Sequence, residues 1–283
     1  MEKLNENNEL FFGMDLKPLD IIERSLVKTY RKPIWARFIK AIKEFELISP
    51  GDKIAIGISG GKDSLILAKL MQELQRHSIY EFDLEFIAMD PGYYPHDREK
   101  LEFITKYLEI PAHIYDSDVF EVSRALDANN PCYMCARMRR GNLYSKAEEL
   151  GCNKLALAHH YDDVIETIML NVLQGGSYKT MMPKLKAQNF EGMELIRPLY
   201  YINENDIIRY TKNAGLKPLD CSCEISEKKS GKRSAVKRLI ESLEGDFTNV
   251  RESIFKSAFN VEMGAIIEWK DKEGEKISFL DEY

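Results

Sequence analysis

Short apolar segments alternate with amphipathic segments through the first two thirds of the chain, and this alternation restricts the fold more than any other feature. Four apolar runs, at 53–58, 84–89, 111–115 and 154–158, are predicted to be strands. Helices are predicted at 17–47, with a break or kink at Pro33, and at 64–76, 95–108, 135–150 and 162–173. Such alternation predicts an α/β fold with a doubly wound parallel sheet, covered by helices on both faces.

The pattern also divides the chain into three regions. Residues 1–50 are predicted to be a helical N-terminal region, 51–200 the α/β domain, and 201–283 a mostly helical C-terminal region. A hydrophobic fraction of 44% over 283 residues can fill a core, which argues against disorder. No apolar run approaches the ~18 residues of a membrane-spanning helix, and the N-terminus lacks the apolar segment of a secretory signal. Five cysteines, an odd number, argue against a disulfide scaffold and predict a cytoplasmic protein.

The segment Ser59-Gly-Gly-Lys-Asp-Ser64 joins the first predicted strand to the helix that follows it. Paired glycines let backbone N–H groups turn toward a phosphate, and the helix N-terminus and the lysine add positive charge. The segment is not a Walker A loop, because Lys62 is followed by Asp63 and no glycine stands at position 56. It predicts a polyphosphate site that does not perform ordinary γ-phosphate hydrolysis.

Polar residues follow three of the predicted strands: 59–64 after the first, Met89 and Asp90 after the second, and 159–163 after the fourth. Ligands of open parallel sheets bind beyond the carboxyl ends of the strands, so one crevice is expected to gather all three loops. Asp162 and Asp163 are candidates for holding Mg²⁺ on a nucleotide or for acting on a base. Asp162 is also placed to cap the helix that begins there.

Four cysteines come in two pairs, Cys132 with Cys135 and Cys221 with Cys223, whereas Cys152 is predicted to be a buried core residue. A helix is expected to begin at Cys135, where its N-terminus would favour thiolates. The spacing leaves three interpretations open: a zinc site made by all four, an iron–sulfur cluster held by three, and a redox pair of Cys132 with Cys135.

Residues 59–64 match the PP-loop of the N-type ATP pyrophosphatases, and two further runs resemble the tRNA 2-thiolation branch of that superfamily, with the 2-thiocytidine synthetases most similar. These runs are Cys132-Tyr-Met-Cys-Ala-Arg-Met-Arg-Arg-Gly-Asn-Leu-Tyr144 and Ala158-His-His-Tyr-Asp-Asp163. The resemblance extends from Ser59 to Cys223. It implies that ATP is cleaved between its α and β phosphates, that AMP is transferred to the C2 oxygen of a tRNA cytidine, and that sulfur then replaces that oxygen.

The resemblance also implies residue roles. The nucleotide would be bound by Ser59, Gly60, Gly61, Lys62, Asp63, Ser64, Met89, Ala158 and Asp163, and catalysis would involve Lys62, Asp63, Asp162 and Asp163. Cys132, Cys135 and Cys223 would hold a 4Fe–4S cluster that has one iron without a protein ligand. Two departures concern Cys221, since the family separates its downstream cysteines by two residues and this chain by Ser222 alone, and Ala158, where the family has glycine.

The net charge of −6 excludes nucleic-acid binding through overall charge alone, but three segments are locally basic. They are 132–147, 176–190 and 228–238, none of which contains an acidic residue. Each alone is typical of a solvated face. The first contains one cysteine pair and the third follows the other, so they converge if the cysteines meet, which predicts a tRNA partner.

Several points stay open in the sequence. A sulfur donor, either a cysteine desulfurase or sulfide, is implied, no membrane partner is expected, and homodimer formation is left open. A 2-thiouridine synthase of the same branch needs nearly the same residues, although it carries additional zinc-binding cysteines near its N-terminus and this chain has none before Cys132. Two further functions compete with thiolation: a PP-loop ligase for a small molecule with structural zinc, and a tRNA-binding protein without activity.

Overall fold

The computed structural model describes residues 12–79, 81–126, 131–219, 231–271 and 273–281. The chain forms two compact units. One contains the residues up to Val164 together with Met181–Ser230, and the other contains Ile165–Thr180 together with the residues from Gly231 onward. The three regions predicted from the sequence stay a prediction.

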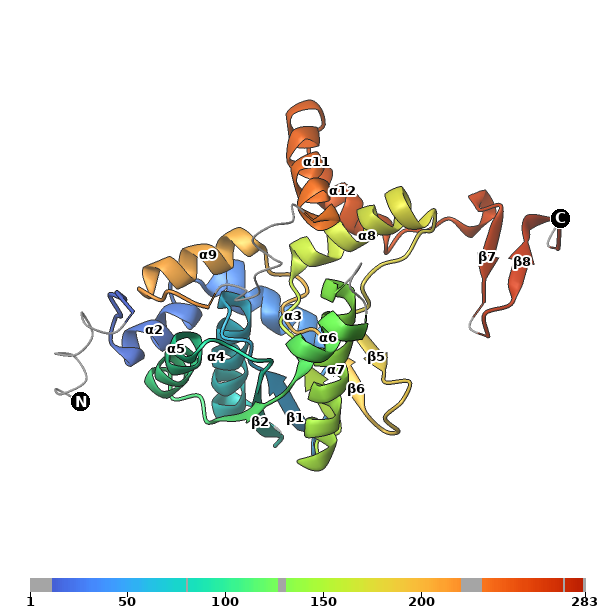
Figure 1. Cartoon of the computed structure of the whole chain (residues 1–283). Helices are drawn as coiled ribbons and strands as arrows, with labels where there is room; N and C mark the ends of the chain where they lie inside the picture. The colour runs from blue at the N-terminus through green and yellow to red at the C-terminus, as the bar shows by residue number, and fades with distance from the viewer. Residues whose placement is uncertain (1–11, 80, 127–130, 220–230, 272, 282–283) are drawn as a thin grey trace. The chain divides into compact units, whose positions relative to one another are not determined.

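The first unit is built on a six-stranded sheet with the strand order β3-β2-β1-β4-β6-β5 (Figure 1). Its strands are β1 (Lys53–Gly57), β2 (Asp83–Asp90), β3 (Ala112–Asp116), β4 (Lys154–Ala156), β5 (Lys184–Lys186) and β6 (Glu194–Ile196). All neighbouring strands are parallel except β5, which runs antiparallel to β6 at the edge. The predicted doubly wound parallel sheet is confirmed, although β5 and β6 were not predicted.

The helices of the first unit follow the predicted alternation. They are α2 (Leu19–Val27), α3 (Ala36–Glu44), α4 (Lys62–His77), α5 (Pro95–Tyr107), α6 (Val119–Leu126), α7 (Pro131–Glu149) and α9 (Glu204–Asn213). The predicted helix over 17–47 is interrupted by a π-helical turn at Arg31–Trp35 that contains Pro33, which lacks a backbone N–H. Because crossovers are right-handed, α4 and α5 lie on one face of the sheet and α7 on the other.

The core between α7 and the sheet explains why this helix is held firmly. Tyr144 and Ala147 on α7 pack against Ala55, Leu155 and Leu195 of three strands. Cys152 belongs to the same cluster and is 6% exposed, which confirms its prediction as a core residue. Burial raises the pKa of its thiol to about 11, so the sulfur stays protonated.

The second unit contains the part of α8 (Tyr161–Gly175) from Ile165 onward, with α11 (Lys232–Asp246) and α12 (Val250–Ser257). It ends in a 3₁₀ turn (Met263–Ala265), the hairpin of β7 (Glu268–Lys270) and β8 (Lys276–Ser278), and a second 3₁₀ turn (Phe279–Asp281). The mostly helical C-terminal region therefore includes a hairpin that the sequence analysis missed. Within the described residues, no helix has the length and apolar character needed to cross a membrane.

Candidate active site

The direction of winding reverses between β1 and β4, which are neighbours in the sheet. The next strand after β1 lies on one side of it and β4 lies on the other, and at such a switch point ligands of open parallel sheets bind beyond the carboxyl ends of the strands. The loop at 59–61 follows β1, and residues 157–160 follow β4. The structure thus brings two of the three predicted polar loops to the same switch point.

The glycine loop has the backbone geometry that a phosphate site needs. Gly60 has a φ of +77°, which favours glycine, and a Cβ there would lie 2.4 Å from the Leu219 side chain. Ser64 Oγ accepts a hydrogen bond from Ser59 N at 3.1 Å and donates one to the Gly61 carbonyl at 2.9 Å. Gly61, at the N-cap position of α4, has no side chain to cap the helix, so its first amides are available to an anion.

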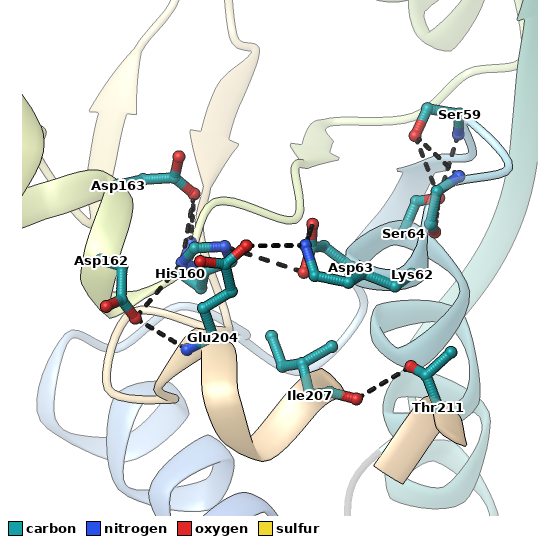
Figure 2. Close-up of polar contacts among 11 residues, drawn as sticks. Ser59, Lys62, Asp63, Ser64, His160, Asp162, Asp163, Glu204, Ile207 and Thr211 are labelled. Carbon is teal, nitrogen blue, oxygen red and sulfur yellow. Dashed lines mark hydrogen bonds and ion pairs between the residues drawn. The ribbon is translucent and has the colours of Figure 1, made fainter. Parts of the chain in front are cut away.

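Lys62 is held between two carboxylates beside this loop (Figure 2). Its Nζ lies 3.1 Å from Asp63 Oδ2 and 3.1 Å from Glu204 Oε1. Burial lowers the pKa of the ammonium, but the charge of Asp63 and the hydrogen bonds to both carboxylates outweigh burial and raise it. Lys62 is therefore a fixed positive charge, and a polyphosphate would compete with two acids for it.

Asp63 is an acid of this group whose pKa is altered by its surroundings. Its Oδ1 is buried, accepts no hydrogen bond within the described part of the chain, and lies 3.7 Å from His160 Nε2. Burial raises the pKa of the Asp63 carboxyl and outweighs the opposite effects of His160 and Lys62. A carboxyl with a raised pKa at a ligand crevice is suited to proton transfer.

Asp162 and Asp163 both accept hydrogen bonds from backbone groups. Asp163 Oδ2 accepts from His160 N at 2.9 Å, which is one half of a capping box at the start of α8. Asp162 Oδ2 accepts from Glu204 N at 2.7 Å, so it stabilises the N-terminus of α9. Each carboxylate thus has a structural task, and the catalytic and Mg²⁺ roles predicted for them stay predictions.

The described residues contain no group of three or more His, Cys, Asp or Glu side chains that could hold a metal ion. Met89 is 5% exposed at the end of β2, and Ala158 is half-buried between β4 and α8. Asp90 binds the N–H groups of Gly92 and Tyr93 and the guanidinium of Arg98. The roles of Met89 and Ala158 toward a nucleotide stay predictions.

The cysteine-bearing end of α7 lies at the same edge of the sheet. The helix begins at Pro131, so the predicted start at Cys135 is wrong; proline is favoured at the first position of a helix. Cys135 is half-buried, and one turn further along α7 Arg139 Nη2 donates to Tyr93 Oη at 3.4 Å. The Tyr93 hydroxyl donates in turn to the Ser59 carbonyl at 3.3 Å, which links α7 to the glycine loop.

Cys221 and Cys223 lie outside the described residues, but the segment before them is anchored. Leu219 N donates to the Gly60 carbonyl at 3.0 Å, and the Leu219 side chain packs over the same glycine. Cys223 follows Leu219 by four residues, which span at most about 14 Å of chain. The chain is thus anchored to the glycine loop at Leu219, just before the second cysteine pair.

The sequence was compared with known families and proteins. Residues 32–227 match the family described as the PP-loop domain. The chain belongs to the PP-loop family. The chain is 38% identical over 224 residues to a tRNA-cytidine(32) 2-sulfurtransferase of Pelobacter propionicus, a match that covers 78% of this chain and 83% of the relative. The protein of the same name from Citrifermentans bemidjiense is 36% identical, with 78% and 88% covered.

A solved PP-loop structure has a similar fold. The U34-tRNA thiolase NcsA from Methanococcus maripaludis, solved with its [4Fe-4S] cluster, superimposes with a TM-score of 0.63 at 25% identity. The match covers 80% of this chain and 79% of that one. Residues 59–64 lie within the segment that matches the PP-loop family.

Sequence reasoning missed two residues of this PP-loop site. Glu204 contacts Lys62 although 142 positions separate them in the chain, and no local pattern marks such a contact. Arg197 follows β6 directly and is 5% exposed; the run Arg197-Pro198-Leu199 fits the resemblance to the thiolation branch, but the sequence assigns the arginine no role. His160, which belongs to the predicted polar loop 159–163, lies between Asp63 and Asp163.

Proposed function

We propose that this chain is an ATP-dependent tRNA sulfurtransferase that converts a cytidine of the anticodon loop to 2-thiocytidine. The observation that carries the proposal is the identity of 38% and 36% to two tRNA-cytidine(32) 2-sulfurtransferases, which extends over most of each relative. The names of these relatives suggest position 32 as the target. The geometry of the carboxyl end of the sheet supports the same chemistry.

The glycine loop is proposed to bind the phosphates of ATP. The free first amides of α4 and the ammonium of Lys62 would stabilise the negative charge that develops when pyrophosphate leaves. Mg²⁺ is expected to bind through phosphate oxygens, with Asp63, Asp162 or Asp163 as carboxylate ligands. Met89, at the end of β2, would lie near the adenine.

The target base must leave its stack so that its C2 oxygen reaches the α-phosphate. Attack of this oxygen forms a C2–O–AMP bond and releases pyrophosphate. Sulfur at the sulfide level then forms the bond to C2, and AMP departs with the oxygen. Among the described acids, Asp63 is best suited to donate or accept a proton during these reaction steps, because its pKa is raised.

Cys132, Cys135 and Cys223 are proposed to hold a 4Fe–4S cluster. The fit rests on the half-buried Cys135 early in α7 and on the anchoring of Leu219, four residues before Cys223, at Gly60. When bound, such a cluster supplies an iron without a protein ligand, which can present sulfur to the base. Cys221 is the alternative third ligand.

The exposed cations of α7 and α11 are proposed to contact the phosphates of tRNA. Arg137 and Arg140 are exposed on α7, and Lys232 and Arg238 are exposed on α11. A cysteine desulfurase or sulfide would supply the sulfur. The reaction would take place in the cytoplasm.

Mass spectrometry of tRNA nucleosides from cells with and without the gene tests the function. We expect 2-thiocytidine to disappear in the deletion strain and to return with the wild-type gene but not with Cys135→Ser. The likeness to a U34-tRNA thiolase favours 2-thiouridine formation as a second candidate. Loss of 2-thiouridine with 2-thiocytidine intact would replace the first proposal by the second, and unchanged thionucleosides would refute both.

A further inference from the structure

Arg197 is a buried cation at the carboxyl end of the sheet. It follows β6 immediately, and Leu157 N still donates to the Ile196 carbonyl at 3.0 Å, so Arg197 stands where the parallel pairing with β4 ends. The residue is 5% exposed. Its place is thus at the ligand-binding edge of the fold and inside the protein.

The described residues accept hydrogen bonds from only part of the Arg197 guanidinium. Its Nη1 donates to the Met182 carbonyl, while Nε is buried and donates to no acceptor. No carboxylate of the described chain lies within ion-pair distance of it. The charged and titratable groups that act on it are Tyr144 and Arg140 of α7, Tyr200 of the following segment and Asp163 of α8, and Arg140 repels it.

A buried charge without an ion partner costs folding free energy, because water solvates it far better than the protein interior does. Burial lowers the pKa of Arg197 to about 10, which still leaves the group protonated at neutral pH. The protein therefore carries a desolvated positive charge with at least one unused donor at this edge.

This fold pairs a buried cation fully where the role is structural. Lys154, in the neighbouring strand β4, is 3% exposed and lies 2.7 Å from Asp52 Oδ2. Its Nζ also donates to the Leu47 carbonyl at 2.9 Å. Arg197 lacks any such carboxylate among the residues that the structure describes, so packing alone does not account for a charged side chain at this position.

We propose that Arg197 binds a phosphate group of the substrates, at a site separate from the glycine loop. The proposal rests on the proposed function, which supplies two phosphate-bearing ligands, ATP and tRNA. Since β4 separates β1 from β6, the end of β6 is two strand spacings, about 10 Å, from the glycine loop. A phosphate there lies on the side of the crevice away from β2, which favours the tRNA backbone beside the target cytidine over the polyphosphate of ATP.

Binding measurements on Arg197→Met and Arg197→Lys test this proposal without requiring thiolation. For Arg197→Met we expect the dissociation constant of unmodified tRNA to rise roughly tenfold to a hundredfold, as for loss of a charged hydrogen bond. The slope of log K against log salt should fall by about 0.7 to 0.9, the value of one phosphate contact. Arg197→Lys should weaken binding and keep the salt slope, because charge remains while the planar fork is lost.

The melting temperature separates binding from a structural role. Because the free protein loses an unpaired buried charge, Arg197→Met should melt at or above the wild-type temperature. Lys154→Met is the matched control, and it should melt lower while the folded protein binds tRNA and ATP normally.

The two ligands identify the source of the phosphate. Weaker binding of tRNA alone assigns the site to the RNA backbone, and weaker binding of ATP alone assigns it to the nucleotide. Unchanged affinity for both ligands in both Arg197 variants overturns the proposal. Failure of the wild-type protein to thiolate tRNA would refute the proposed function and leave this binding test unaffected.

Discussion

The two ends of the parallel sheet treat ionisable side chains in opposite ways. At the amino end, Lys154 and Asp52 form a buried pair in which Asp52 also accepts from Ser49 N at 2.6 Å and from Asn153 Nδ2 at 2.8 Å. At the carboxyl end, Asp63 Oδ1, His160 Nδ1 and Arg197 Nε are buried and make no hydrogen bond to any residue that the structure describes. The polar side chains at the amino end stabilise the fold by pairing with one another. Those at the carboxyl end retain hydrogen-bonding capacity that a ligand can use.

Asp52 and Asp63 show the same contrast in protonation. Burial alone would raise the pKa of Asp52, but hydrogen bonds from Lys154, Ser49 and Asn153 lower it. Asp63 also has cationic neighbours, yet burial prevails and its pKa is raised. Local hydrogen bonding, and not the residue type, thus decides whether an aspartate of this sheet is a structural ion or an acid able to exchange a proton.

The largest expected effect is the loss of the buried pair at the amino end. Lys154→Met leaves Asp52 buried beside a methionine, so the free energy of unfolding should fall by about 3 to 5 kcal/mol. Urea unfolding measures it. Lys53→Met is the control, since Lys53 pairs with Glu85 where both side chains are partly exposed, and its loss should cost far less. Equal losses would remove the distinction between buried and surface pairs.

A smaller effect on stability is expected when the pH is lowered, and it arises from Asp52 at the amino end of the sheet. Because the pKa of Asp52 is lower in the folded protein, its contribution is present above its unfolded pKa of about 3.9 and is lost as pH falls through the folded value. Asp52→Asn should therefore weaken the protein at pH 7 and flatten its stability profile below about pH 4. An acid profile identical to wild type would contradict this role.

The smallest expected effect is the pH dependence of stability at the carboxyl end of the sheet. Its sign is opposite to that expected for Asp52. The raised pKa of Asp63 makes its contribution greatest below its unfolded pKa, and the contribution is lost as pH rises through the folded value. The melting temperature of Asp63→Asn relative to wild type should hence increase from pH 4 to pH 7. A difference that is constant or decreases with pH would show that Asp63 is a paired ion like Asp52.

Sequence patterns predicted the elements that carry their own local signal. The buried run at 53–58 followed by two glycines was enough to predict β1, the loop and α4. Strands β5 and β6 are three residues each, too short for periodicity to reveal. The start of α7 was misplaced because Pro131 was assigned to the preceding loop, although proline commonly occupies the first helical position.

The candidate site was predictable only in part, for a physical reason. The loop residues and the two aspartates after β4 follow strands directly, so their edge of the sheet can be deduced. Two ion pairs join segments that are distant in the chain, Lys62 with Glu204 and Lys154 with Asp52. They depend on how α9 and β4 pack, so no local pattern predicts them. That Arg197 has no carboxylate partner among the described residues can be seen only in the three-dimensional structure.

The most direct test of the account is an anaerobic reaction of the cluster-loaded protein with ATP, sulfide and unmodified tRNA, in which all products are counted. The account predicts one AMP and one pyrophosphate for each 2-thiocytidine formed, and no product when Lys62 is replaced by methionine. Formation of ADP and phosphate, or thiolation without pyrophosphate release, would contradict it.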